Sequence, residues 1–211
     1  MLRFLALASL LIPLQAEIVD RVAVAAGQQV ITELQLDEEL RVAAFLNRQP
    51  VQRDLPARRA AANRLIEQLL IRREMDLSNY PLPAPDQVDR FEAQVRAALG
   101  EQDFDLALGK YNLTEDVLRE HLANQLTTLQ FIQVRFRPEL GVSPADIESY
   151  YQGELARWKS AHPGSAAPPS IDSRDSIRKT LVDQRTDEAL EAWLDESRNQ
   201  MAIEYVDKSL Q

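Results

Sequence analysis

Apolar positions follow two different periods along this chain, first that of strands and then that of helices. Residues 21–26 and 29–31 are short runs of small and β-branched apolar side chains, as strands prefer, and Gly27-Gln28 between them suits a two-residue turn. Thr32 and Gln35 then have the spacing of a capping box, and apolar residues recur behind them every three or four positions. The pattern predicts a β-hairpin that leads directly into a helix.

The helical period returns several times, and prolines, glycines and capping residues separate its occurrences. We expect further helices over residues 57–77, 86–99, 104–111, 115–137, 144–158 and 174–199. Residues 201–206 alternate like an edge strand. Because a two-stranded hairpin is barely stable alone, this last strand is expected to join it, so that the two chain ends meet. The predicted fold class is mainly α, with a small N-terminal β-hairpin joined by a C-terminal strand.

The composition of the chain excludes several classes of function. The chain has 211 residues, of which 45% are hydrophobic, so it can form a core. Its formal net charge of −9 argues against nucleic-acid binding, which needs a basic surface, and against anionic lipid surfaces. It has no Cys, which excludes disulfides, a thiol nucleophile and a Cys-based zinc site.

The N-terminus has the layout of a secretory signal peptide. Arg3 supplies a positive charge, residues 4–14 are an apolar run, and Ala16 offers a small residue for cleavage. Residues 1–16 are therefore interpreted as a signal peptide, and the mature chain is expected to be exported to the periplasm. No other segment is apolar enough to span a membrane, so we expect no membrane insertion.

The rest of the chain is predicted to form one helical unit, on which the C-terminal segment packs. Residues 17–159 would form an N-terminal helical core with the β-hairpin. Residues 160–173 are small, polar and rich in proline, which is typical of a linker. Residues 174–211 would pack back on the core as a helix and a strand. Since the linker could act as a hinge, exchange of this terminal segment between two chains would allow a homodimer.

No catalytic or cofactor motif is found, and neither a cofactor nor a metal is expected. His121 lies inside a predicted helix and is interpreted as a surface or hydrogen-bonded residue. Glu38 and Glu39 are expected on a solvated helix face. Apolar and aromatic residues gather in the middle helices, and they could form either ordinary core or an exposed peptide-binding groove. The candidates for such a groove are Phe91, Val95, Phe104, Leu108, Tyr111 and Phe131.

The order of these segments resembles the SurA-like periplasmic chaperones. The resemblance rests on the opening strand, turn and helix, on the second helix over 61–71, and on three later stretches: 108–114, 142–151 and 177–206. Residues 142–151, which read VSPADIESYY, are similar to the family's segment that leads toward a parvulin-type prolyl isomerase domain. Here only a short linker follows, between Trp158 and Ser173, so the isomerase activity is not expected.

The resemblance implies an ATP-independent chaperone that binds unfolded or nascent exported polypeptides, outer-membrane proteins in particular. It would be a chaperone module without enzyme activity. Two alternatives remain: a scaffolding or assembly subunit that binds one folded partner, and, less favoured because the domain is missing, a peptidyl-prolyl isomerase.

Overall fold

The computed structural model describes residues 20–100, 104–136, 141–164 and 174–211. Over these residues the chain is mainly helical with one small three-stranded antiparallel sheet, which confirms the predicted fold class. The helices are α1 (Glu33–Leu46), α2 (Leu55–Leu77), α3 (Pro85–Leu99), α4 (Phe104–Lys110), α5 (Glu115–Arg135), α6 (Pro144–Ala161) and α7 (Arg174–Asn199). The strands are β1 (Val22–Ala26), β2 (Gln29–Thr32) and β3 (Ile203–Tyr205), and a 3-10 turn, η2 (Lys208–Leu210), ends the chain.

The sheet joins the two ends of the chain. Its strand order is β2-β1-β3, so the central strand β1 pairs with its hairpin partner on one side and with the C-terminal strand on the other. Gly27 opens the hairpin turn at a φ of 61°, a left-handed conformation that glycine adopts without steric cost. Its N–H donates to Ala202 O at 2.9 Å, so the same turn also holds the entry to β3.

Capping residues explain where the helices begin. Thr32 and Gln35 form the predicted capping box of α1, with Thr32 Oγ1 accepting from Gln35 N and Gln35 Oε1 accepting from Thr32 N. Helix α2 begins earlier than predicted, because Asp54 caps it and Pro56 lies in its first turn instead of in a loop. Helix α3 likewise begins at Pro85. A proline fits the first turn of a helix, where its missing N–H would have no partner.

The buried apolar residues form three clusters. The first lies between the sheet, α1, α2 and the end of α7, and it includes Val24, Leu36, Ile66 and Leu210. The second joins the end of α1 to α3, α4 and the start of α5. The third, around Phe131, joins the ends of α2 and α5 to α7. Because α1, α2, α5 and α7 each contribute to two clusters, these four helices form the frame of the body.

The C-terminal residues are held on α2. Leu210 is 1% exposed in the first apolar cluster, and Arg59 Nε donates to its carbonyl oxygen at 2.9 Å. Arg58 Nη2 donates to Asp207 Oδ2 at 2.8 Å and to Glu33 Oε2 at 2.8 Å. The last residues of the chain are therefore part of the core and of a charged contact with the start of α1.

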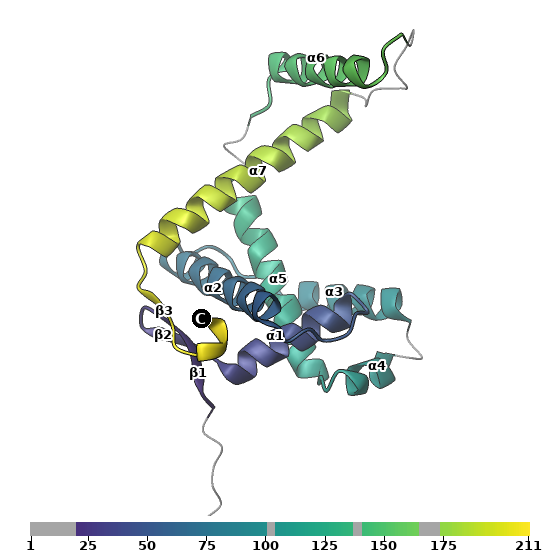
Figure 1. Cartoon of the computed structure of the whole chain (residues 1–211). Helices are drawn as coiled ribbons and strands as arrows, with labels where there is room; N and C mark the ends of the chain where they lie inside the picture. Colours follow the sequence, from purple (N-terminus) through teal and green to yellow (C-terminus); the bar gives the residue numbers. More distant parts are fainter. Residues whose placement is uncertain (1–19, 101–103, 137–140, 165–173) are drawn as a thin grey trace, which may run out of the picture.

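Helix α6 lies apart from α1–α5 and packs on the first half of α7 (Figure 1). Ile147 and Ile177 are buried there, and Arg185 of α7 forms an ion pair of 3.0 Å with Asp146. The predicted linker 160–173 begins too early by two residues, since α6 continues to Ala161, where the ring of His162 stacks on Trp158. The remainder of that linker from residue 165, and the predicted signal peptide 1–16, lie outside the described residues.

Among the described residues, no helix combines the length and the apolar character needed to cross a membrane.

Candidate functional site

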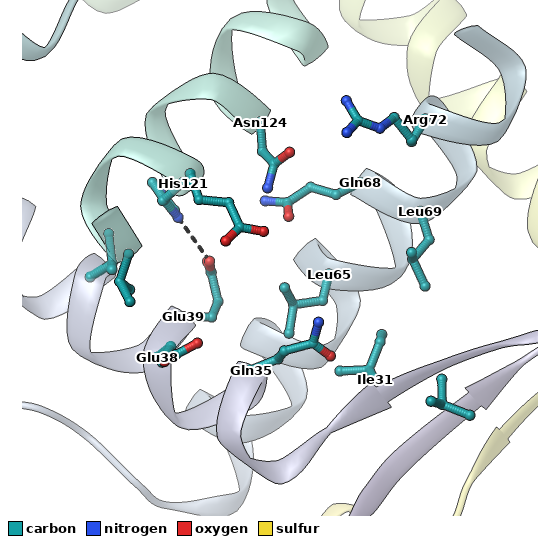
Figure 2. A pocket seen from close by; sticks show the side chains of 14 residues that line it. Ile31, Gln35, Glu38, Glu39, Leu65, Gln68, Leu69, Arg72, His121 and Asn124 are labelled. Carbon is teal, nitrogen blue, oxygen red and sulfur yellow. Dashed lines mark hydrogen bonds and ion pairs between the residues drawn. The ribbon is translucent and has the colours of Figure 1, made fainter. Parts of the chain in front are cut away.

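A cleft of about 390 Å³ opens where α1, α2 and α5 diverge beside strand β2 (Figure 2). Each helix contributes four residues at the spacing i, i+3, i+4, i+7, which is one face of a helix. These faces consist of Gln35, Glu38, Glu39 and Val42 on α1, Leu65, Gln68, Leu69 and Arg72 on α2, and Val117, Glu120, His121 and Asn124 on α5. Val30 and Ile31 of β2 complete the lining.

Glu39 joins the three helices at the inner wall of this cleft. Its Oε1 accepts from Arg64 Nε of α2 at 2.6 Å, and its Oε2 lies 3.0 Å from His121 Nδ1 of α5. The Glu39 side chain is only 3% exposed, whereas Arg64 is 43% exposed. An ionised carboxylate can only accept, so the proton between Glu39 and His121 belongs to Nδ1, which fixes the orientation of the imidazole ring.

The two neighbouring glutamates of α1 differ in their acidity. Burial raises the pKa of Glu39, but hydrogen bonds and charges from His121 and Arg64 outweigh burial, so its pKa lies below the ordinary value. Burial also raises the pKa of Glu38, where Arg41 opposes the effect and Glu120 adds to it. Glu38 therefore lies near a second carboxylate without an ion-pair partner of its own among the described residues.

Several polar groups of the cleft have no partner within the described part of the chain. These are the side-chain amides of Gln68 and Asn124, the carboxylates of Glu38 and Glu120, and the guanidinium of Arg72. In Figure 2 the amides of Gln68 and Asn124 point toward the middle of the cleft, and Glu38 and Arg72 lie toward opposite ends of it. The lining thus offers a bound molecule hydrogen-bond donors and acceptors, and it also offers the apolar side chains of Leu65 and Leu69.

The lining consists of carboxylate, imidazole, amide, guanidinium and apolar side chains. No Ser, Thr, Cys, Tyr or Lys is among the lining residues, so the Glu39–His121 pair has no hydroxyl, thiol or amine beside it to activate. Within the described ranges, no three His, Cys, Asp or Glu side chains are arranged to hold a metal ion. The side chains present can form hydrogen bonds, charge contacts and apolar contacts with a bound molecule.

The six apolar candidates lie elsewhere and do not form one surface. Phe104, Leu108 and Phe131 are at most 5% exposed, and Phe131 belongs to the third cluster while the other two belong to the second. The remaining three, Phe91, Val95 and Tyr111, are half-buried against the second cluster. The interpretation as core packing thus describes these residues better than an exposed groove does, because their side chains pack between helices.

The sequence pattern missed the cleft because its key residues are polar. Glu39 was expected on a solvated face, and this expectation is wrong: it is buried and paired on two sides. His121 was interpreted as a surface or hydrogen-bonded residue, and the contact with Glu39 confirms this. A charged residue at a position that continues the apolar face of Leu36 and Leu40 was the available signal.

Comparison with models of known protein families and with curated proteins found no match for this chain.

Proposed function

We propose that this protein is an ATP-independent periplasmic chaperone module that holds unfolded polypeptide in the cleft between β2, α1, α2 and α5. The observation that carries the proposal is the convergence of unpaired amide groups and apolar side chains in one open cleft. Gln68 and Asn124 can hydrogen-bond the backbone of an extended chain, and Leu65 and Leu69 can contact its apolar side chains. The resemblance of the sequence to the SurA-like chaperones supports the same function.

The sheet beside the cleft adds a second means of holding extended chain. Strand β2 pairs with β1 on one side only, and Val30 on β2 is 50% exposed. An unpaired strand edge can accept backbone hydrogen bonds from an added strand, which is a common mode of peptide recognition. Such contacts are independent of the client's sequence, as a chaperone that binds many unfolded chains requires.

The proposal is tested by light scattering. An outer-membrane barrel protein unfolded in urea is diluted into buffer without nucleotide, with and without a stoichiometric amount of this protein. We expect suppressed aggregation with the wild type. The variant Gln68→Trp, which fills the cleft, should suppress it much less. Gln94→Trp on α3 is the matched control, because Gln94 is exposed and lies outside the cleft, and it should act like the wild type.

Two results would overturn the proposal. If folded wild-type protein leaves aggregation unchanged, a dedicated role as an assembly subunit with one folded partner becomes the better hypothesis. If Gln68→Trp and Gln94→Trp both suppress aggregation fully, unfolded chains are held at another surface and not in this cleft. Faster isomerisation of a prolyl peptide than with a heat-inactivated control would instead support an isomerase.

A further inference from the structure

Two carboxylates that line the cleft have no cation paired with them in the described part of the chain. Glu38 of α1 and Glu120 of α5 both line it, and neither forms an ion pair or a side-chain hydrogen bond within the described residues. The charges act on each other, since Glu120 is among the causes that raise the pKa of Glu38. Glu38 is half-buried and Glu120 is exposed. The like charges of these two residues repel each other, and a cation placed near both would relieve that repulsion.

The cations already present do not meet this need. Arg41 is the basic side chain that acts on Glu38, but it binds Asp37 at 3.0 Å and donates to the carbonyl oxygen of Asn112. Arg72 lies toward the other end of the cleft in Figure 2. Arg64 already forms an ion pair with Glu39 on the inner wall. Arg41 acts on Glu38 more strongly than Glu120 does, and Glu120 has no ion-pair partner among the described residues. A positive charge brought by a ligand would therefore add to the attraction of Arg41 for Glu38 and would give Glu120 a partner.

The backbone of β2 indicates that this ligand is an extended chain. Ala26 and Gln29 flank the two-residue turn and so form a hydrogen-bonded pair, and Ala25 opposite Val30 is then a pair without hydrogen bonds. The N–H and C=O of Val30 consequently point away from β1, along the open edge of the sheet. Since Val30 also lines the cleft, a strand added there would place its side chains over the space that Glu38 and Glu120 border.

We propose that the cleft prefers extended polypeptide segments that carry a lysine or arginine, whose cationic group binds between Glu38 and Glu120. The inference rests on the proposed function and names the kind of client segment that the cleft selects. Gln68 and Asn124 bind the backbone of the segment, and the apolar side chains next to the cation contact Leu65 and Leu69. The formal charge of −9 on the whole chain favours the approach of such basic segments.

The test uses fluorescence anisotropy with two short fluorescein-labelled peptides. They are apolar and unstructured, and they differ only in a central lysine or glutamine. At physiological salt the wild type should bind the lysine peptide about tenfold more tightly, as two charge contacts, one to a half-buried and one to an exposed carboxylate, imply. The double variant Glu38→Gln/Glu120→Gln should bind both peptides equally, with an affinity near that of the wild type for the glutamine peptide.

The matched control is Glu188→Gln/Glu191→Gln on α7. Both residues are exposed and outside the cleft, and the control removes the same amount of negative charge. It should keep the tenfold preference. If it loses the preference as well, the effect is one of total charge and the assignment to Glu38 and Glu120 is overturned.

The remaining outcomes separate this inference from the proposed function. Equal binding of the two peptides by the wild type overturns the inference and leaves peptide binding in place. Absence of binding by either peptide, with the fold intact by circular dichroism, contradicts both. A preference that survives in Glu38→Gln/Glu120→Gln shows that another group binds the cation, which also overturns the inference.

Discussion

Glu39 and His121 are 82 positions apart in the sequence, and a contact of 3.0 Å joins Oε2 of one to Nδ1 of the other. Arg64 holds the second oxygen of the same carboxylate. One buried side chain thus connects α1, α2 and α5, the three helices that form the cleft. Apolar packing already joins these helices, and a carboxylate with two donors adds directional contacts between them.

Removal of the Glu39 charge should destabilise the protein. Glu39→Gln keeps the size of the side chain but removes the charge that Arg64 pairs with and one of the two acceptor oxygens, and we expect a loss of about 2 kcal/mol in the free energy of unfolding. The partly exposed Arg64 can be solvated by water, which keeps the loss moderate. Urea denaturation followed by circular dichroism measures it. Glu38→Gln is the neighbouring control and should change the stability little, because Glu38 has no hydrogen bond to lose among the described residues.

The contribution of Glu39 to the free energy of unfolding should depend on pH. Its pKa is lower in the folded than in the unfolded chain, so its ionised form stabilises the fold. That stabilisation is complete above the ordinary pKa of a glutamate and is lost as the pH falls through the lower pKa of the folded state. The difference in the free energy of unfolding between wild type and Glu39→Gln should therefore shrink as the pH is lowered from 7 to roughly 3. A difference that stays constant over this range would contradict the assignment.

Phe131 should be among the most sensitive positions of the third cluster. Its ring is fully buried and lies 4.7 Å from that of Trp193 and 5.6 Å from that of Phe136, measured between centroids. Phe131→Ala leaves a cavity there and should cost about 3–5 kcal/mol. Leu129→Ala, two positions earlier and 58% exposed, should cost little. Thermal unfolding followed by Trp fluorescence compares the two, and similar melting temperatures would contradict the packing described.

Asp207 should control how firmly the C-terminal segment is held. It pairs with Arg58 at 2.8 Å, and its Oδ1 caps η2 by accepting from Ser209 N at 2.9 Å. Its hydrogen bonds hold its pKa well below the ordinary range, with Glu33 the largest cause. Asp207→Ala should cost about 1–2 kcal/mol and speed amide exchange in β3 and η2. Asp187→Ala, at an exposed position of α7, is the control, and equal exchange in both variants would contradict the prediction.

Two glycine substitutions should have opposite effects. At Gly27 an added Cβ would lie 3.6 Å from Met201 Cγ, an ordinary contact, so Gly27→Ala is penalised by its φ of 61° alone, by about 1–2 kcal/mol. At Gly153, inside α6, a Cβ would meet nothing within 4 Å, so Gly153→Ala should stabilise that helix by up to about 1 kcal/mol. Urea denaturation of both variants checks the signs.

The elements were predictable because their signals are local. The capping box of Thr32 and Gln35, the cap at Ser143 with Pro144 behind it, and the glycine turn at Gly27 each act within a few residues. Even the return of β3 could be expected, since a hairpin alone is barely stable. The early starts of α2 and α3 were missed because a proline can begin a helix as well as end one, and the capping geometry decides between the two.

The cleft could not be predicted, because its residues are defined by contacts between distant helices. Glu38 and Glu39 are neighbours of the same type in the sequence, but Glu38 is half-buried and Glu39 is buried. Only the approach of Arg64 and His121 separates them. The apolar candidates show the converse: Phe104 and Phe131 stand out in the sequence as large and apolar, and such residues are most often used to hold helices together.

The pairing of β1 with β3 has a consequence for how the protein comes to fold. Synthesis runs from the N-terminus, so the central strand β1 is made long before its partner β3. Leu194 and Leu210 of the first apolar cluster are also made long after β1. Until then the newly made chain has a hairpin with an open edge and an incomplete core, and closure of so long a loop is slow. An incomplete core with an open strand edge exposes the chain to aggregation while it folds.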